Sequence, residues 1–250
     1  MSRSAPIPTL SPERHRELLA FLRELGLEPG ASHPDGDVDL TPIHEALTHS
    51  STGKGHDHER LEFLGDAVLR LAASEFLRCE QPQLPVGRHA SLRAQLVSDR
   101  WLARLGERCH LEQVWLLGAM ATGDAAGRAT VYAELCEALI GAIYLVWGGP
   151  QGGLLPVTTW LTPHWRTSLA VYLEDPNRDN WKSALQEWSQ GQGLGLPHYT
   201  CIELSSQHGD PERFSCTVTA GPLSGQGSGP SRRAAQQAAA AAALTQRRHA

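Results

Sequence analysis

The sequence predicts an all-α domain followed by a small α+β domain with the element order α-β-β-β-α. Two long apolar stretches in the front part, residues 58–77 and 130–147, have the spacing of helices. Behind residue 180, apolar and polar residues alternate as in strands, and helical segments flank this region on both sides. A short polar linker at 176–180 separates the two patterns. It places the domains at residues 10–175 and 179–248.

Local signals support the individual elements. Ser11 followed by Pro12 is a helix start, because serine caps exposed N–H groups and proline suits the first helical position. The run Ala238–Ala243 predicts an ordered helix, since alanine is the best helix former and a small side chain lets a helix lie close to a sheet. The expected front helices span residues 12–25, 41–47, 58–77, 89–104, 130–147 and 160–173, with loops at 28–39 and 118–129. The rear domain is expected to have helices at 180–190 and 232–244, strands at 199–204 and 214–219, and a turn-rich segment at 221–231; the order α-β-β-β-α adds a third strand without bounds of its own.

Composition narrows the class of protein. The 250 residues are 41% hydrophobic, which is enough for real cores, and no apolar run reaches the ~20 residues of a bilayer span. The N-terminus has no charged segment followed by an apolar one, so no secretory signal is expected. Five cysteines without a C-x-x-C spacing indicate reduced thiols in a cytoplasmic protein, not a disulfide framework. The net charge of −5 divides into +1 from Asp179 onward and −6 before it, and such an acidic chain is a poor prior for a nucleic-acid binder.

A stripe of acids runs along the first apolar helix. Glu59, Glu62 and Asp66 fall within an arc of roughly 60° on a helix. The apolar residues Phe63 and Leu69 flank them, so we expect this helix to be largely buried. Buried carboxylates need partners or a metal ion. The opposite side of the helix, expected to face a core, carries Leu61, Leu64, Val68 and Leu71.

The second apolar helix carries Glu134 and Glu137, which also share one face. If the two helices pack side by side, all five acids converge on one point. Oxygen ligands at that density suit Mg²⁺, for which Mn²⁺ can substitute, and carboxylate-held magnesium supports phosphodiester hydrolysis. Spacing alone leaves a purely structural acidic cluster as an equal alternative. His49 is taken as a hydrogen-bonded structural residue in preference to a ligand.

Residues 58–69 (HERLEFLGDAVL) resemble the signature of the ribonuclease III family. The resemblance continues through residues 47–51 (LTHSS), 91–97 (SLRAQLV) and 132–145 (YAELCEALIGAIYL). The tail resembles a double-stranded-RNA-binding domain, with WKSALQE at 181–187, LPHY at 196–199 and a Gly-x-Gly…Ser-Arg-Arg…Ala-Ala ending. These motifs cover about residues 46–244 in the family's order. The fold implied is an all-α endonuclease domain followed by the small α+β RNA-binding domain.

The resemblance also implies roles for the acids. Glu62, Glu134 and Glu137 would ligate Mg²⁺, and Asp66 would act with Glu137 in catalysis. Glu59 would be a supporting residue that positions substrate or the dimer, and Phe63 would pack across a homodimer interface. The implied activity is cleavage of double-stranded RNA to 5′-phosphate and 3′-hydroxyl ends.

Several positions depart from the family pattern. Glu134 stands where the family usually has Asp, so its carboxylate reaches one methylene further, and His58 stands where the family has Asn. The segment Gly225–Ser231 looks like an RNA-domain loop about two residues longer than usual, and Glu28–Leu40 looks like an insertion.

Candidate RNA contacts follow from how duplex RNA is recognised, by minor-groove 2′-hydroxyls and by phosphates. Lys182 and Gln186 share one face of the domain's first helix, and His208 lies in the loop after the first strand. Arg232 and Arg233 open the last helix, where the helix dipole assists phosphate binding. The sequence therefore predicts a magnesium-dependent double-stranded-RNA endonuclease that processes ribosomal and other structured precursor RNAs. The alternatives are a non-catalytic RNA-binding relative, which usually loses one of the acids, and a plain helical scaffold.

Overall fold

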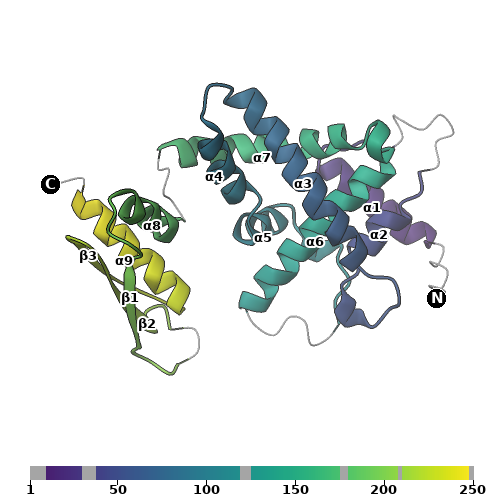
Figure 1. The fold of residues 1–250 in the computed structure, drawn as a ribbon. Coiled ribbons are helices and arrows are strands. Elements are labelled where there is room, and N and C mark those ends of the chain that lie inside the picture. The colour runs from purple at the N-terminus through teal and green to yellow at the C-terminus, as the bar shows by residue number, and fades with distance from the viewer. Residues whose placement is uncertain (1–9, 30–37, 119–124, 175–179, 208–209, 248–250) are drawn as a thin grey trace, which may run out of the picture. The chain divides into compact units, whose positions relative to one another are not determined.

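The structure, a computed structural model, describes residues 10–29, 38–118, 125–174, 180–207 and 210–247 (Figure 1). The chain divides into two compact units, Met1–Ala170 and Val171–Ala250. The first is helical, and the second holds a three-stranded sheet between helices. This is the predicted fold class. The domain bounds expected at 10–175 and 179–248 stay a prediction.

The helices of the front unit follow the predicted order. Their bounds are α1 Pro12–Glu24, α2 Thr41–Ala46, α3 Glu59–Glu80, α4 Val86–Leu96, α5 Asp99–Arg108, α6 Ala125–Val146 and α7 Leu154–Glu174. Ser11 caps α1 by accepting a hydrogen bond from the Arg14 N–H at 3.1 Å, as its position before Pro12 predicted. Short 3-10 turns follow α2, α5 and α6 at Ser50–Thr52, Leu111–Gln113 and Gly149–Gln151.

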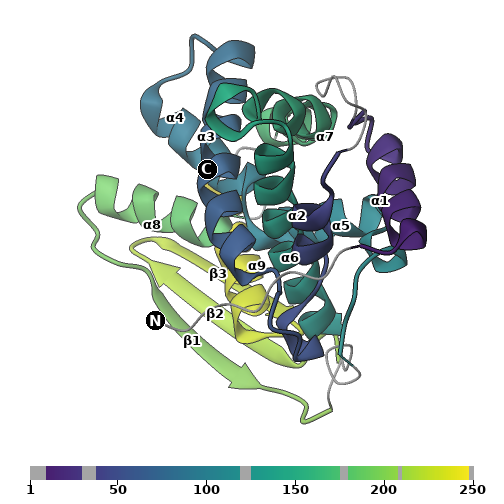
Figure 2. The same ribbon diagram turned by 90° about the vertical axis from the view of Figure 1, so that its right-hand side faces the viewer.

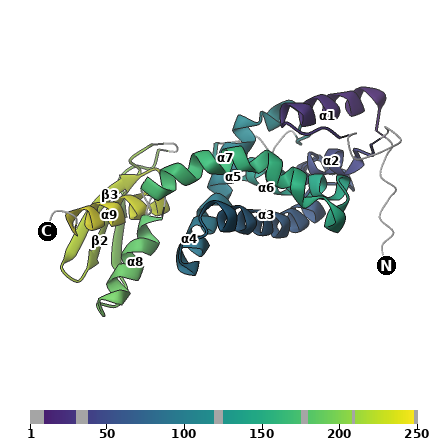
Figure 3. The same ribbon diagram turned by 90° about the horizontal axis from the view of Figure 1, so that it is seen from above.

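The long helices α3 and α6 pack side by side at the centre of this unit, and α5 packs on α6 (Figures 1 and 3). Leu61 and Leu69 of α3 and Leu139 of α6 are fully buried there. By length and composition the stretch Gly127–Val146 of α6 could cross a membrane, contrary to the sequence expectation, but 67% of its apolar window is buried within the fold. Burial of this kind is typical of a core helix.

Some boundaries and faces differ from the expectation. The helix predicted at 89–104 is two helices, because the Ser98 side chain accepts the Trp101 N–H and starts α5. Residues 125–129, expected in a loop, already belong to α6. The helix α3 is not buried all round: Phe63 is 85% exposed and Leu71, expected in the core, is 52% exposed. One face of α3 is therefore open.

The rear unit comprises α8 Trp181–Gly191, β1 His198–Glu203, β2 Phe214–Ala220, β3 Leu223–Gly229 and α9 Arg232–Arg247. The strands form an antiparallel sheet of order β1-β2-β3, and α9 packs against β2 and β3 (Figure 2). Gly225 to Ser231, expected to be a loop, are strand as far as Gly229. A hairpin turn at 221–222 precedes that strand.

Small residues let α9 approach the sheet closely. A methyl group on Gly225 or Gly227 would overlap the backbone of α9 around Ala239. Ala235, Ala239 and Ala243 are fully buried on the facing side of the helix. The alanine run is therefore an ordered packing surface, as predicted.

The expectation of five reduced thiols is wrong for Cys201 and Cys216, which form a disulfide between β1 and β2. The two residues are direct partners in the antiparallel register, which places their side chains next to each other. Sequence spacing alone does not reveal that register. Cys79, Cys109 and Cys136 are free.

Candidate active site

Two glycines bring the acidic helices together. A methyl group on Gly65 of α3 would overlap the Glu137 carbonyl oxygen of α6, and one on Gly141 would overlap the Leu61 carbonyl oxygen. Backbone therefore meets backbone at this crossing. Residues next to it on either helix, including Asp66 and Glu137, are consequently held close to each other.

The acids of both helices line one open hollow of ≈ 760 Å³. None of the described residues that line this hollow is a lysine or arginine. The five predicted acids all take part: Glu59, Glu62 and Asp66 from α3, and Glu134 and Glu137 from α6. The convergence expected from the two stripes is what the structure has.

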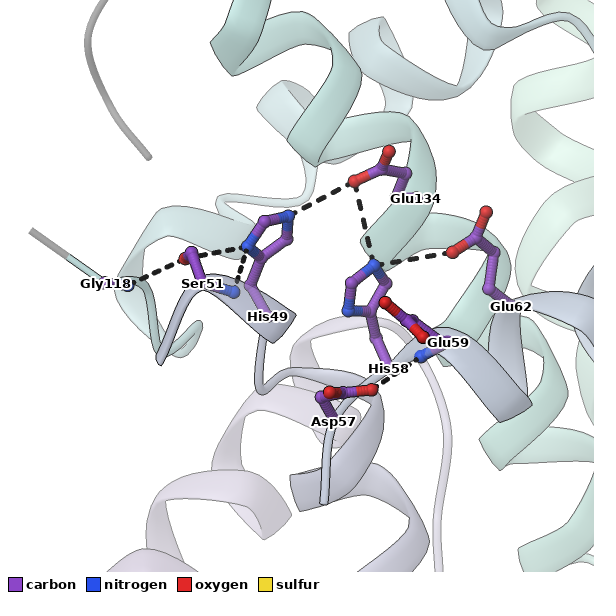
Figure 4. A network of polar contacts seen from close by, with 8 residues as sticks. All are labelled: His49, Ser51, Asp57, His58, Glu59, Glu62, Gly118 and Glu134. Carbon is purple, nitrogen blue, oxygen red and sulfur yellow. Dashed lines mark hydrogen bonds and ion pairs between the residues drawn. The ribbon is translucent and has the colours of Figure 1, made fainter. Parts of the chain in front are cut away.

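Two histidines face Glu134 across the hollow (Figure 4). His49 Nε2 lies 3.2 Å from Glu134 Oε2. His58 Nε2 lies 3.7 Å from the same oxygen and 3.4 Å from Glu62 Oε2. The two rings stack with centroids 4.8 Å apart and planes 13° apart. Both imidazoles thus present Nε2 to carboxylates.

Backbone contacts hold His49 in place. Its N–H donates to the Leu116 carbonyl at 2.9 Å, and its Nδ1 accepts the Ser51 N–H at 3.1 Å. An Nδ1 that accepts leaves the proton of a neutral ring on Nε2, which then donates to Glu134. The Ser51 hydroxyl oxygen, 2.8 Å from Nδ1, also accepts the Gly118 N–H. As expected, His49 is hydrogen-bonded, but its partner is one of the candidate metal ligands.

The electrostatic environment differs between the acids. Burial first, then Asp66 and Glu62, raise the pKa of Glu137 to about 7. Burial also raises the pKa of Glu62, opposed by His58. The His58 and His49 imidazoles instead lower the pKa of Glu134. Burial lowers the pKa of His58, but Glu134 and Glu62 outweigh it, so the net shift is upward. Burial and neighbouring carboxylates therefore act together at Glu137.

The remaining predicted residues of α3 lie at the rim. Arg70 holds Asp66 through Nε, 2.8 and 2.9 Å from its two carboxylate oxygens. Glu59 is exposed, and its backbone N–H donates a hydrogen bond to the Asp57 carboxylate at 3.2 Å. Phe63 extends into solvent beside the acids.

In the rear unit, the predicted RNA contacts differ in how exposed their side chains are. Arg232 and Arg233 are exposed at the start of α9, and Gln186 is exposed on α8. Lys182 is half-buried: its ammonium donates to Gln236 at 2.7 Å and lies 5.1 Å from the Tyr199 ring centre. His208 lies outside the described residues.

Sequence reasoning missed three supporting features of the site. The crossing glycines were visible only as interruptions in apolar helices. Arg70 stands four residues after Asp66, a spacing that predicts an ion pair on a helix. His58 stands four residues before Glu62, which places both on one helix face.

Comparison with known proteins follows the division into two units. Residues 41–152 match the family model described as ribonuclease-III-like, and residues 181–247 match the double-stranded RNA binding motif. Ribonuclease 3 of Prochlorococcus marinus is 44% identical over 98% of each chain. The chain belongs to the ribonuclease III family. It is therefore an endonuclease with a double-stranded-RNA-binding domain behind its nuclease domain.

Two further ribonuclease III proteins are similar to this chain, one over nearly its whole length and one over the nuclease domain. Ribonuclease 3 of Gloeobacter violaceus is 40% identical over 93% of each chain. The crystal structure of the nuclease domain of ribonuclease III from Campylobacter jejuni is 26% identical, with a TM-score of 0.50, and covers 64% of this chain and 97% of that one. The nuclease-domain fold thus agrees with the helical front unit.

Proposed function

We propose that this protein cleaves double-stranded RNA by Mg²⁺-dependent hydrolysis, leaving 5′-phosphate and 3′-hydroxyl ends. The supporting observation is the convergence of five carboxylates on one open hollow whose described lining has no lysine or arginine. Carboxylates crowded around one hollow suit a divalent cation, and Arg70 pairs with Asp66 at its rim. The oxygen-rich donor set fits Mg²⁺, with Mn²⁺ as a substitute.

Glu62, Glu134 and Glu137 would hold the ion, and Asp66 would complete the site. When bound, a divalent ion lowers the pKa of its water and stabilises charge on the attacking and leaving oxygens of a phosphodiester. Asp66 is pre-oriented by the Arg70 guanidinium. Without the ion the pKa of Glu137 is about 7, and binding of a divalent ion would displace its proton and keep the carboxylate ionised as a ligand. Together, Asp66 and Glu137 are the proposed catalytic pair.

Substrate binding is assigned to the rear unit. The exposed Arg232 and Arg233 at the start of α9 are placed to meet phosphates, and the exposed Gln186 to meet the minor groove. Lys182 would contribute by orienting Gln236 and Tyr199. Glu59 would support the position of the RNA at the rim of the hollow.

A homodimer would supply one hollow for each strand of a duplex. The support is Phe63, an aromatic side chain 85% exposed beside the acids, at the position where the resemblance to the family implies a dimer contact. We further propose that the protein is cytoplasmic and processes ribosomal, messenger and transfer RNA precursors with duplex structure.

The decisive test is cleavage of a long duplex RNA by the full chain and by Glu137→Ala. We expect the wild type to cut in Mg²⁺, to stop on addition of EDTA, and to leave ends that a 5′-phosphate-dependent exonuclease can degrade. We expect Glu137→Ala to bind the duplex but to cut it at least ~100-fold more slowly, because it removes a proposed ligand and one member of the proposed catalytic pair. A wild type that does not cut in Mg²⁺ or Mn²⁺ while it binds the duplex would favour the non-catalytic alternative.

A further inference from the structure

His49, His58 and Glu134 form a cluster whose ligand chemistry differs from that of the acidic site beside it. One ligand atom from each residue lies within 4.8 Å of the others. The cluster combines imidazole nitrogens with a carboxylate, and Glu62 adds a second carboxylate at 3.4 Å from His58 Nε2. Imidazole nitrogen suits Zn²⁺ and neighbouring first-row ions, whereas Mg²⁺ takes oxygen ligands.

We propose that these side chains form a binding site for a Zn²⁺-like divalent ion, with His49, His58 and Glu134 as ligands and Glu62 as the fourth. Zinc bonds of about 2.0–2.2 Å in a tetrahedron put neighbouring ligand atoms about 3.3–3.6 Å apart. The Nε2 atoms lie 3.2 and 3.7 Å from Glu134 Oε2, and His58 Nε2 lies 3.4 Å from Glu62 Oε2. These three pairs of ligand atoms are therefore close to the required spacing before any ion binds.

His58 is buried, and one of its ring nitrogens is directed into the cluster. The residue is 2% exposed, and its Nδ1 has no hydrogen-bond partner among the described residues. The polar contacts that His58 makes through its ring go through Nε2 into the cluster (Figure 4).

The surroundings of His49 supply a second layer of support. Coordination through Nε2 places the ring proton on Nδ1, where the Ser51 hydroxyl oxygen at 2.8 Å can accept it. This replaces the contact from the Ser51 N–H, and the Gly118 N–H keeps the hydroxyl in place. Such outer hydrogen bonds are the usual way in which ligating histidines are oriented.

The site shares Glu62 and Glu134 with the proposed magnesium site. An ion bound to the histidines would therefore compete with Mg²⁺ for these carboxylates. Only this competition rests on the proposed function. The binding itself does not depend on RNA cleavage.

The test is Co²⁺ binding to the full chain, prepared without a histidine tag and stripped of metal with a chelator. Cobalt reports ligand number through its visible absorption. We expect wild type to bind one Co²⁺ with the intense spectrum of four-coordinate cobalt, without a sulfur charge-transfer band, and to release it on addition of Zn²⁺. We expect His58→Asn and, separately, His49→Asn to weaken this binding more than ~100-fold, since loss of outer partners alone costs 10–100-fold.

The matched control is His110→Asn. His110 also pairs with a glutamate, with Nδ1 3.3 Å from Glu112 Oε1, but that pair is exposed. His110 has a φ of 53°, which asparagine adopts readily. The His110→Asn variant should bind Co²⁺ as the wild type does. Circular dichroism verifies the fold of each variant, and the two ligand variants give independent readings.

Two results would overturn the proposal. One is the absence of Co²⁺ binding by the wild type. The other is a weak six-coordinate spectrum that persists unchanged in His58→Asn and His49→Asn, because the ion would then sit on carboxylates alone. Failure to cut RNA in Mg²⁺ would instead contradict the proposed function and leave the Co²⁺ result standing.

Discussion

Glu134 and Glu137 stand on one face of α6, but their surroundings differ. His58 and His49 face Glu134 and lower its pKa, while burial, Asp66 and Glu62 raise the pKa of Glu137 to about 7. The acids and their helix faces could be predicted, because i, i+3 spacing defines a face. The difference between their pKa shifts could not be predicted, because it depends on which residues another helix and a distant loop place opposite each side chain.

This difference predicts a pH-dependent stability of the metal-free protein. A carboxyl whose pKa rises on folding binds its proton more tightly when folded, so the folded state loses stability as pH rises from ~4.3 through about 7. Glu137→Gln removes this loss. In EDTA, we expect its Tm to exceed that of the wild type by more at pH ~8 than at pH ~5.

Thermal unfolding at both pH values measures the effect. The control is Glu24→Gln, which changes an exposed carboxylate at the end of α1. Its Tm should differ from that of the wild type by the same amount at both pH values. Addition of Mg²⁺ at the higher pH should raise the Tm of the wild type more than that of Glu137→Gln. A Tm difference that does not change with pH would mean that folding does not raise the pKa of Glu137.

At the scale of elements, the sequence predicted the type and order of the helices better than their contacts. Apolar spacing continues from Leu96 to Leu102 across the break between α4 and α5, so periodicity alone joined the two helices. The Ser98 cap was the local signal of the break. The crossing of α3 and α6 had no periodic signal, since glycines add no apolar side chain to either stripe.

The crossing predicts that Gly65→Ala is strongly destabilising. The added methyl group would overlap the Glu137 carbonyl oxygen, so the helices must separate. We expect a loss of at least ~1–3 kcal/mol in the free energy of unfolding, measured by urea denaturation, together with reduced cleavage because the acids move apart. Gly87→Ala in α4 is the control, since its methyl group meets nothing within 4 Å and should be neutral or stabilising by up to ~1 kcal/mol. Equal stability of the two variants would show that the crossing is looser than described.

At the scale of the whole molecule, the exposed Phe63 predicts association of two copies. It lies in α3 next to the acids and is 85% exposed. We expect Phe63→Ser to weaken dimerisation by at least ~10-fold in sedimentation equilibrium, since burial of such a side chain contributes ~1.5–3 kcal/mol. Val86→Ser, which changes an apolar residue that is 83% exposed on α4, should leave the dimer intact. An unchanged equilibrium in Phe63→Ser would place the interface elsewhere.

Division of labour between the units predicts how RNA binding responds to salt. The rear unit carries exposed Arg232 and Arg233 at a helix N-terminus, while the front unit carries the acids. Lysines and arginines that contact phosphates release counterions, so each contact adds to the slope of log K against log[salt]. We expect Arg232→Ala with Arg233→Ala to weaken binding similarly for all duplex sequences and to reduce that slope by ~1–2. The control is Arg213→Ala in the same unit, because Arg213 is already paired with Glu203 at 2.7 Å and should leave the slope nearly unchanged. A double variant with wild-type affinity and slope would assign the phosphate contacts to other residues, and an effect confined to particular sequences would indicate base readout in place of charge.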